Sequence, residues 1–124
     1  MRVFKNKAFQ RFADRNNISN DDLCDVVHRA SRGLIDADLG GGVIKQRIAR
    51  RGKGKSGGFR LMILFRAQRR AVLVHGFAKK DRANIETGEL EALRKLAKIV
   101  LAYSEEEMAS AVASGVFVEV KCND

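Results

Sequence analysis

The chain has 124 residues, 45% of them hydrophobic, and its 24 Lys and Arg residues against 15 Asp and Glu residues give a formal net charge of +9. This length fits a single domain, and this hydrophobic content excludes a disordered basic tail. A folded domain with so much positive charge favours nucleic acid, a ribosome surface or an acidic protein as partner. Charge alone does not choose among these partners.

The N-terminal residues and the cysteines indicate the cellular compartment of the protein. Residues 1–5 lack the apolar block of a signal peptide, and no apolar run of about 18 residues follows. We therefore expect a cytoplasmic protein without a membrane partner. Cys24 lies in an apolar helical pattern and Cys122 lies near the C-terminus, and both are expected to be free thiols. The sequence has neither His clusters nor Cys pairs, so it predicts no metal site and no cofactor.

The N-terminal part of the chain predicts a short strand and two helices. Residues 2–4 form the possible strand, and residues 5–15 space their apolar side chains as a helix does. Ser19 and Asp22 have the spacing of a capping box, and the apolar stripe that follows predicts a second helix ending near Gly33.

The middle of the chain predicts three strands. Glycines 40–42 break the chain, and β-branched residues among cations predict a strand over residues 43–51. Apolar side chains alternate from residue 59 to residue 66, and a third strand is expected over residues 71–77. Because the links between these strands are short, they are expected to form an antiparallel meander.

The C-terminal part predicts two further helices. Residues 86–102 place their leucines on one face, which is typical of a helix that packs on a sheet. Ser104 and Glu107 form a second capping box, which opens a short helix reaching Val112. Residues 116–120 are a possible edge strand. We expect one α+β domain over residues 1–124, with a short C-terminal extension at about 104–124.

Positive charge is concentrated in the middle of the chain. Thirteen Lys and Arg residues lie between residues 45 and 82, a stretch with a single acid, Asp81. Glycines surround Lys53 and Lys55 and lead to Arg60, so backbone and cations could converge on one phosphate group. The alternative is a solvated hairpin loop whose charges serve solubility. The cations on the flanking strands favour phosphate binding.

Further cations extend the expected RNA-binding surface. The segment 79–82 follows the third predicted strand, and it either contacts RNA or opens a short capped helix, with Asp81 orienting Lys79 or Arg82. The side chains expected to contact RNA are Lys45, Arg47, Arg50, Arg51, Lys79, Lys80 and Arg82.

Two other motifs are interpreted as structural. Gly54-Lys55-Ser56 imitates part of a nucleotide-binding P-loop, but Ala49 stands where the first glycine is required, and the segment joins two strands. His75 lies in an apolar strand, where a half-buried structural histidine is commoner than a catalytic one.

Residues 43–60, followed by a hydrophobic strand and residues 76–81, resemble the HigB-like branch of the RelE/ParE toxin superfamily. The shared pattern is a Gly-Lys-Gly-Lys-Ser-Gly-Gly-x-Arg motif with a downstream Gly-Phe-x-Lys-Lys-Asp segment, over about residues 40–90. The resemblance implies a small α+β domain with two N-terminal helices packed on a twisted antiparallel sheet and with C-terminal helices. It also implies a cognate antitoxin, which is expected to be a helix-turn-helix protein. The toxin is expected to contact operator DNA only through this antitoxin.

Many members of that superfamily are ribosome-dependent mRNA endonucleases. By resemblance, Lys53, Lys55 and Arg60 occupy the positions of the active-site cations, and Lys80 lies near a further phosphate-contacting residue. The final active-site tyrosine of the best-understood members falls near Glu86 here, and the only tyrosine is Tyr103. Because RNA supplies its own 2′-OH nucleophile, cleavage needs no metal, only proton transfer and cations around the phosphorus.

Three functions are therefore weighed. The leading one is a toxin that cleaves mRNA on the ribosome and so inhibits translation. The second is a non-catalytic toxin of the same fold that poisons a DNA-associated target such as gyrase, and the third is an inactive RNA-binding relative.

Overall fold

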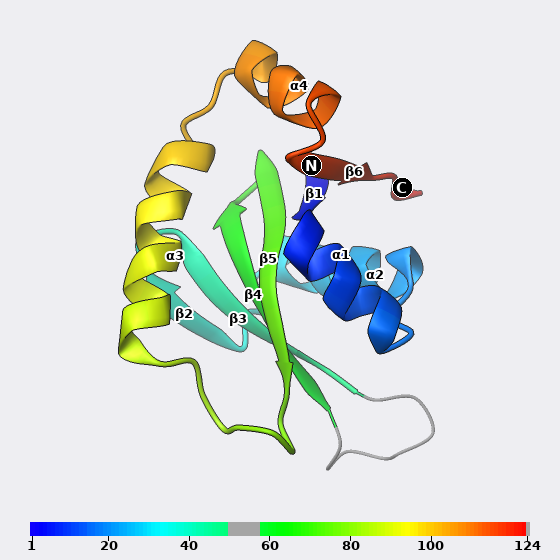
Figure 1. Ribbon diagram of the computed structural model, residues 1–124, viewed down its shortest axis with the longest axis vertical. Coiled ribbons are helices and arrows are strands. Elements are labelled where there is room, and N and C mark those ends of the chain that lie inside the picture. Colours follow the sequence, from blue (N-terminus) through cyan, green and yellow to red (C-terminus); the bar gives the residue numbers. More distant parts are fainter. Residues whose placement is uncertain (50–57, 124) are drawn as a thin grey trace.

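The computed structural model describes residues 1–49 and 58–123, which form a single sheet with helices on both faces (Figure 1). The elements, in chain order, are β1 (Arg2–Asn6), α1 (Lys7–Arg15), α2 (Asn20–Ser31), β2 (Ala37–Gly40), β3 (Val43–Ile48), β4 (Phe59–Arg66), β5 (Arg70–Ala78), α3 (Thr87–Val100), α4 (Glu105–Ala113) and β6 (Phe117–Val120).

The sheet has six strands in the order β2-β3-β4-β5-β1-β6. The antiparallel meander expected for the middle of the chain is confirmed, because β3 pairs with β4 and β4 pairs with β5, both antiparallel. One pair departs from the expected antiparallel sheet: β1 lies parallel to β5. The last strand, β6, pairs antiparallel with β1 and forms an edge of the sheet. The α+β fold class is thereby confirmed.

Each face of the sheet has its own hydrophobic core. Helices α1 and α2 cover one face, where Phe9, Leu23 and Leu61 are fully buried. Helices α3 and α4 cover part of the other face, where Val100 and Met108 pack on strand residues. Strand alternation assigns the side chains of β3 and β4 to these two faces in turn, and in β5 a register shift opposite Met62 and Ile63 interrupts the alternation.

Local sequence signals explain where the helices begin. The Ser19 hydroxyl accepts a hydrogen bond from the Asp22 amide, and the Asp22 carboxylate accepts one from the Ser19 amide, which confirms the first capping box. Ser104 and Glu107 make the same exchange at the start of α4. Helix α3 begins after Glu86, whose amide donates to the Glu89 carboxylate over 3.1 Å.

Gly76 sets how closely α1 approaches the sheet. A Cβ atom on Gly76 would lie 2.4 Å from the Phe12 ring, closer than real contacts allow. Only glycine at this position therefore leaves room for the Phe12 ring to pack on β5. The side chains of the residues before and after Gly76 point to the opposite face of the sheet.

Several expectations are wrong or incomplete. Strand β2 was not anticipated, because its four residues carry no clear alternation. Strand β3 ends at Ile48, whereas the expectation extended to residue 51 and so partly lies outside the described residues. The segment after β5 forms turns instead of opening a helix at Lys79.

The two cysteines are not free thiols. Cys24 and Cys122 form a disulfide that joins α2 to the C-terminal segment across 98 residues of sequence, with Cα atoms 5.7 Å apart. Pairing of β6 with β1 brings the end of the chain beside α2, a contact that no local pattern predicts.

Candidate functional site

The predicted cations of β3 and β4 share the face of the sheet that carries α3. Arg47 pairs with Arg60, which pairs with Phe77, so these residues form one row across three strands. Lys45, Met62 and His75 form the neighbouring row. Gly76 lies between the two β5 positions and faces α1, which fixes the orientation of both rows. We call the surface formed by Lys45, Arg47, Arg60 and Arg82 the cationic face.

Arg60 lies at the centre of the cationic face and is half-buried. Its only hydrogen bond in the described part of the chain is a long one, 3.4 Å, from Nη1 to the Phe59 carbonyl. Arg47 is more exposed, and its guanidinium lies 3.7 Å from the Asp36 carboxylate. Arg60 therefore retains unused donors, and it forms a like-charge pair with Arg47 across the strands, which by itself is unfavourable.

Arg82 joins the cationic face from the turn after β5. Its guanidinium carbon lies 4.6 Å from the centre of the Phe77 ring, a cation–π contact. Nη1 and Nη2 donate to the two carboxylate oxygens of Glu89 over 2.5 and 3.0 Å, and Nη2 also lies 2.7 Å from Nε2 of His75. The partner of Arg82 is thus Glu89 of α3, and not Asp81 as expected.

These contacts determine the charges in the cluster. Because arginine stays protonated, its Nη2 donates and the Nε2 atom of His75 must accept, which leaves His75 neutral. Burial, followed by the charge of Arg82, lowers the pKa of His75, and Glu89 opposes the shift. The hydrogen bonds from Arg82 and from the Glu86 amide lower the pKa of Glu89 to about 2.

The remaining predicted cations lie near the same end of the sheet or outside the described residues. Lys79 and Lys80 are exposed, and the Lys79 amide donates to the Gly58 carbonyl, so this turn adjoins the start of β4. The side chains that fall outside the described residues are Arg50, Arg51, Lys53 and Lys55.

The sequence did not indicate Glu89, because an acid in the first turn of a helix is usually explained by the helix dipole. His75 was interpreted as a half-buried structural residue, and it is partly buried with Arg82 as its neighbour. The sequence feature that could have indicated the contact between His75 and Arg82 was a polar residue in an apolar strand with an arginine seven positions later.

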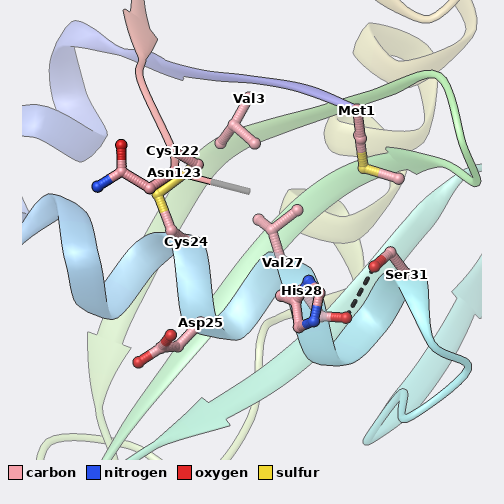
Figure 2. A pocket seen from close by; sticks show the side chains of 9 residues that line it. All are labelled: Met1, Val3, Cys24, Asp25, Val27, His28, Ser31, Cys122 and Asn123. Atoms are coloured by element: carbon pink, nitrogen blue, oxygen red, sulfur yellow. Dashed lines mark hydrogen bonds between the residues drawn. A yellow bond between two sulfur atoms is a disulfide. The ribbon is translucent and has the colours of Figure 1, made fainter.

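A second concave surface lies far from this cluster, between α2 and the C-terminal segment. Figure 2 shows this groove, with the disulfide at one end and Met1 at the other. Val3 and Val27 form part of its wall, and Asp25 and His28 of α2 also line it. In residues 1–49 and 58–123 there is no cluster of His, Cys, Asp and Glu suited to a metal ion. None of the described helices is long and apolar enough to cross a membrane.

Comparison with known proteins agrees with the fold. A family model described as the RelE toxin of the RelE/RelB toxin–antitoxin system matches residues 1–120. A search among curated proteins gives no match. The match to the family model extends over nearly the whole chain, from β1 to the end of β6. This chain therefore belongs to the RelE family, the toxins of toxin–antitoxin systems that pair with a RelB antitoxin.

Proposed function

We propose that this toxin is an endoribonuclease that cleaves mRNA on the ribosome and thereby inhibits translation, as the resemblance to the HigB-like branch implies. The observation that carries the proposal is the row of Arg47, Arg60 and Phe77 with Arg82 stacked on Phe77. Arg60 and Arg82 adjoin Phe77, and Arg47 lies one strand further along the same row, so three guanidinium groups on one face suit an RNA phosphate.

The reaction is an attack within the RNA. The 2′-oxygen forms a bond to the adjacent phosphorus while the bond from phosphorus to the 5′-oxygen breaks, leaving a 2′,3′-cyclic phosphate and a 5′-hydroxyl. One proton leaves the 2′-OH and another reaches the departing 5′-oxygen. The protein has to place a proton acceptor, a proton donor and cations around the charged phosphorus, and no metal or cofactor is required.

Arg60 is the residue we assign to the developing negative charge, because it is half-buried and keeps free donors. Lys53 or Lys55 would act as base, since a lysine crowded by cations loses its proton more readily. The residues proposed to hold RNA around them are Lys45, Arg47, Arg50, Arg51, Lys79, Lys80 and Arg82.

The proposal includes a place and a partner. The toxin would work in the cytoplasm, where mRNA is translated. Its RelB-type antitoxin, proposed to carry a helix-turn-helix, would restrain it and provide the only contact with operator DNA. One domain over residues 1–124 would then carry both the RNA surface and the antitoxin surface.

The test uses two arginine variants that remove the same charge. Arg60→Ala should lower the cleavage of ribosome-bound mRNA at least ~100-fold, the scale of losing one transition-state donor. Arg69→Ala is the control, because Arg69 is exposed in the turn at the other end of β4. Cleavage is followed on a labelled message in purified ribosomes, and circular dichroism verifies folding.

Each outcome selects among the functions weighed from the sequence. Loss in Arg60→Ala with full activity in Arg69→Ala supports the endoribonuclease. If the wild-type toxin arrests growth while mRNA stays intact, a non-catalytic poison of a target such as gyrase is favoured. If it binds RNA without cleavage or arrest, the protein is an inactive RNA-binding relative.

A further inference from the structure

Arg82 is held more firmly than any other cation of the cationic face. Two carboxylate oxygens of Glu89, the Nε2 atom of His75 and the ring of Phe77 all contact its guanidinium group. Its backbone belongs to an irregular turn between β5 and α3, so the backbone by itself does not fix the side chain. The orientation of Arg82 therefore depends on the two side chains that accept its hydrogen bonds.

Glu89 is itself fixed in place. It lies in the first turn of α3, and its Oε1 atom accepts the Glu86 amide over 3.1 Å while it also binds Arg82. His75 comes from the interior strand β5, one residue before Gly76, which faces α1. Arg82 is thus connected to both α3 and β5, the two elements that adjoin the cationic face.

The Glu89 carboxylate and the Nε2 atom of His75 are not suited to exchange protons with RNA. The pKa of Glu89, about 2, keeps this carboxylate ionised at neutral pH, and Arg82 already occupies both of its oxygens. The Nε2 atom of His75 accepts from Arg82 and is not available for another proton. A role in holding Arg82 accounts for all of these contacts.

On the basis of the proposed function, we propose that Glu89 and His75 are positioning residues, which hold Arg82 over Phe77 beside Arg60 so that its guanidinium faces the RNA phosphate. Glu89 offsets part of the charge of Arg82 and so adds no affinity for a polyanion. What it provides is a fixed direction for the remaining donors. A group whose geometry is set before the reaction accelerates the chemical step more than it strengthens binding.

The decisive measurement separates the cleavage rate from binding. Glu89→Ala should lower the single-turnover cleavage rate at least ~10-fold while ribosome affinity changes less than about threefold. Glu89→Gln keeps an acceptor for Arg82, so its cleavage rate should lie between those of Glu89→Ala and the wild type. Glu91→Ala is the matched control, because it removes the same charge from an exposed position of α3 and should cleave normally.

A double variant tests whether Glu89 acts through Arg82. If it does, Arg82→Ala and the double variant Arg82→Ala, Glu89→Ala should cleave at the same rate, because the positioned group is already absent. Thermal unfolding of every variant identifies losses that come from misfolding. An unchanged or faster cleavage rate in Glu89→Ala, or additive losses in the double variant, would overturn the inference.

The side-chain NMR spectrum of Arg82 provides a readout that does not depend on cleavage. Hindered rotation should give Arg82 separate Nη resonances in the wild-type toxin and averaged ones in Glu89→Ala. Averaged resonances in the wild type would reject the positioning role. If the wild-type toxin cleaves no ribosome-bound message, the proposed function fails, and these resonances alone decide whether Glu89 positions Arg82.

Discussion

At the scale of single residues, the contacts around Arg82 tie stability to pH. The pKa of His75 is lowered from 6.5, so its contribution to the free energy of unfolding is present above that pH and is lost as pH falls below it. The pKa of Glu89 is lowered from 4.5 to about 2, so its contribution is present above pH 4.5 and is lost as pH falls towards 2.

The stability of variants at these two positions should therefore depend on pH in different pH ranges. Glu89→Gln should lower the free energy of unfolding at neutral pH by about 1 kcal/mol, because solvent screens this half-exposed pair, and the deficit should shrink below pH 4.5. His75→Gln should reduce the loss of unfolding free energy that occurs as pH falls just below 6.5. It should not alter the loss that occurs below pH 4.5. Urea unfolding across this pH range measures both, and parallel curves for wild type and variants would contradict the prediction.

Gly76 is the residue on which the spacing between α1 and β5 depends. Gly76→Ala should lower the free energy of unfolding by about 2 kcal/mol, because the new methyl group would overlap the Phe12 ring. Adding Phe12→Leu should recover part of the loss. Gly88→Ala is the control, since nothing lies within 4 Å of a Cβ there, and it should be neutral or slightly stabilising. Equal stability of the two alanine variants would show that the ring moves aside freely.

At the scale of elements, Arg70 connects the start of β5 with the end of α3 and the start of α4. Its side chain is buried, and its Nη1 atom donates to the carbonyls of Val100 and Tyr103 over 2.9 and 3.0 Å. Its Nη2 atom donates to Glu105 over 3.4 Å. The carbonyls at the end of α3 thus find their donor in a strand side chain, which seats both C-terminal helices on the sheet.

Replacing this side chain should loosen both helices. Arg70→Met keeps most of the volume but removes the donors, and we expect a loss of about 2–3 kcal/mol in the free energy of unfolding. Arg69→Ala, one residue earlier and exposed, should stay within about 0.5 kcal/mol of the wild type. Denaturant titration measures both, and hydrogen exchange should show α3 and α4 as the regions that lose protection. A neutral Arg70→Met would mean that water replaces the donors.

At the scale of the whole molecule, the disulfide closes a loop that contains most of the domain. It restrains the unfolded chain across 98 residues, and it fastens the segment after β6 to α2. In a reducing cytoplasm, where we propose that the toxin works, such a bond forms only when an oxidant is present.

The toxin should therefore be more stable when oxidised. Oxidised wild-type protein should exceed reduced protein by about 2–4 kcal/mol in the free energy of unfolding, the usual effect of closing a long loop. Cys122→Ser should match the reduced protein and should not respond to reductant. Urea unfolding with and without dithiothreitol measures the difference, and equal midpoints for oxidised and reduced wild type would show that the bond does not form.

The elements whose signals are local could be predicted from the amino-acid sequence. Capping boxes at Ser19 and Ser104 and the apolar stripes of α2 and α3 follow a helical period, and alternation predicted β4 and β5 together with their antiparallel pairing. The concentration of cations before and within these strands also placed Arg47 and Arg60 on one sheet. These inferences succeeded because hydrogen bonds within a helix and short links between strands act over a few residues.

Contacts between residues far apart in the chain could not be predicted in this way. The insertion of β1 beside β5, the pairing of β6 with β1 and the Cys24–Cys122 bond depend on how the two cores pack, and no local pattern encodes them. The same holds for the candidate site, where the sequence predicted the arginines but not Glu89, which reaches Arg82 only once α3 has packed on the sheet. Lys53 and Lys55 stay predictions outside the described residues. Long-range pairing is chosen by the whole set of buried contacts, and so it cannot be read from any one segment.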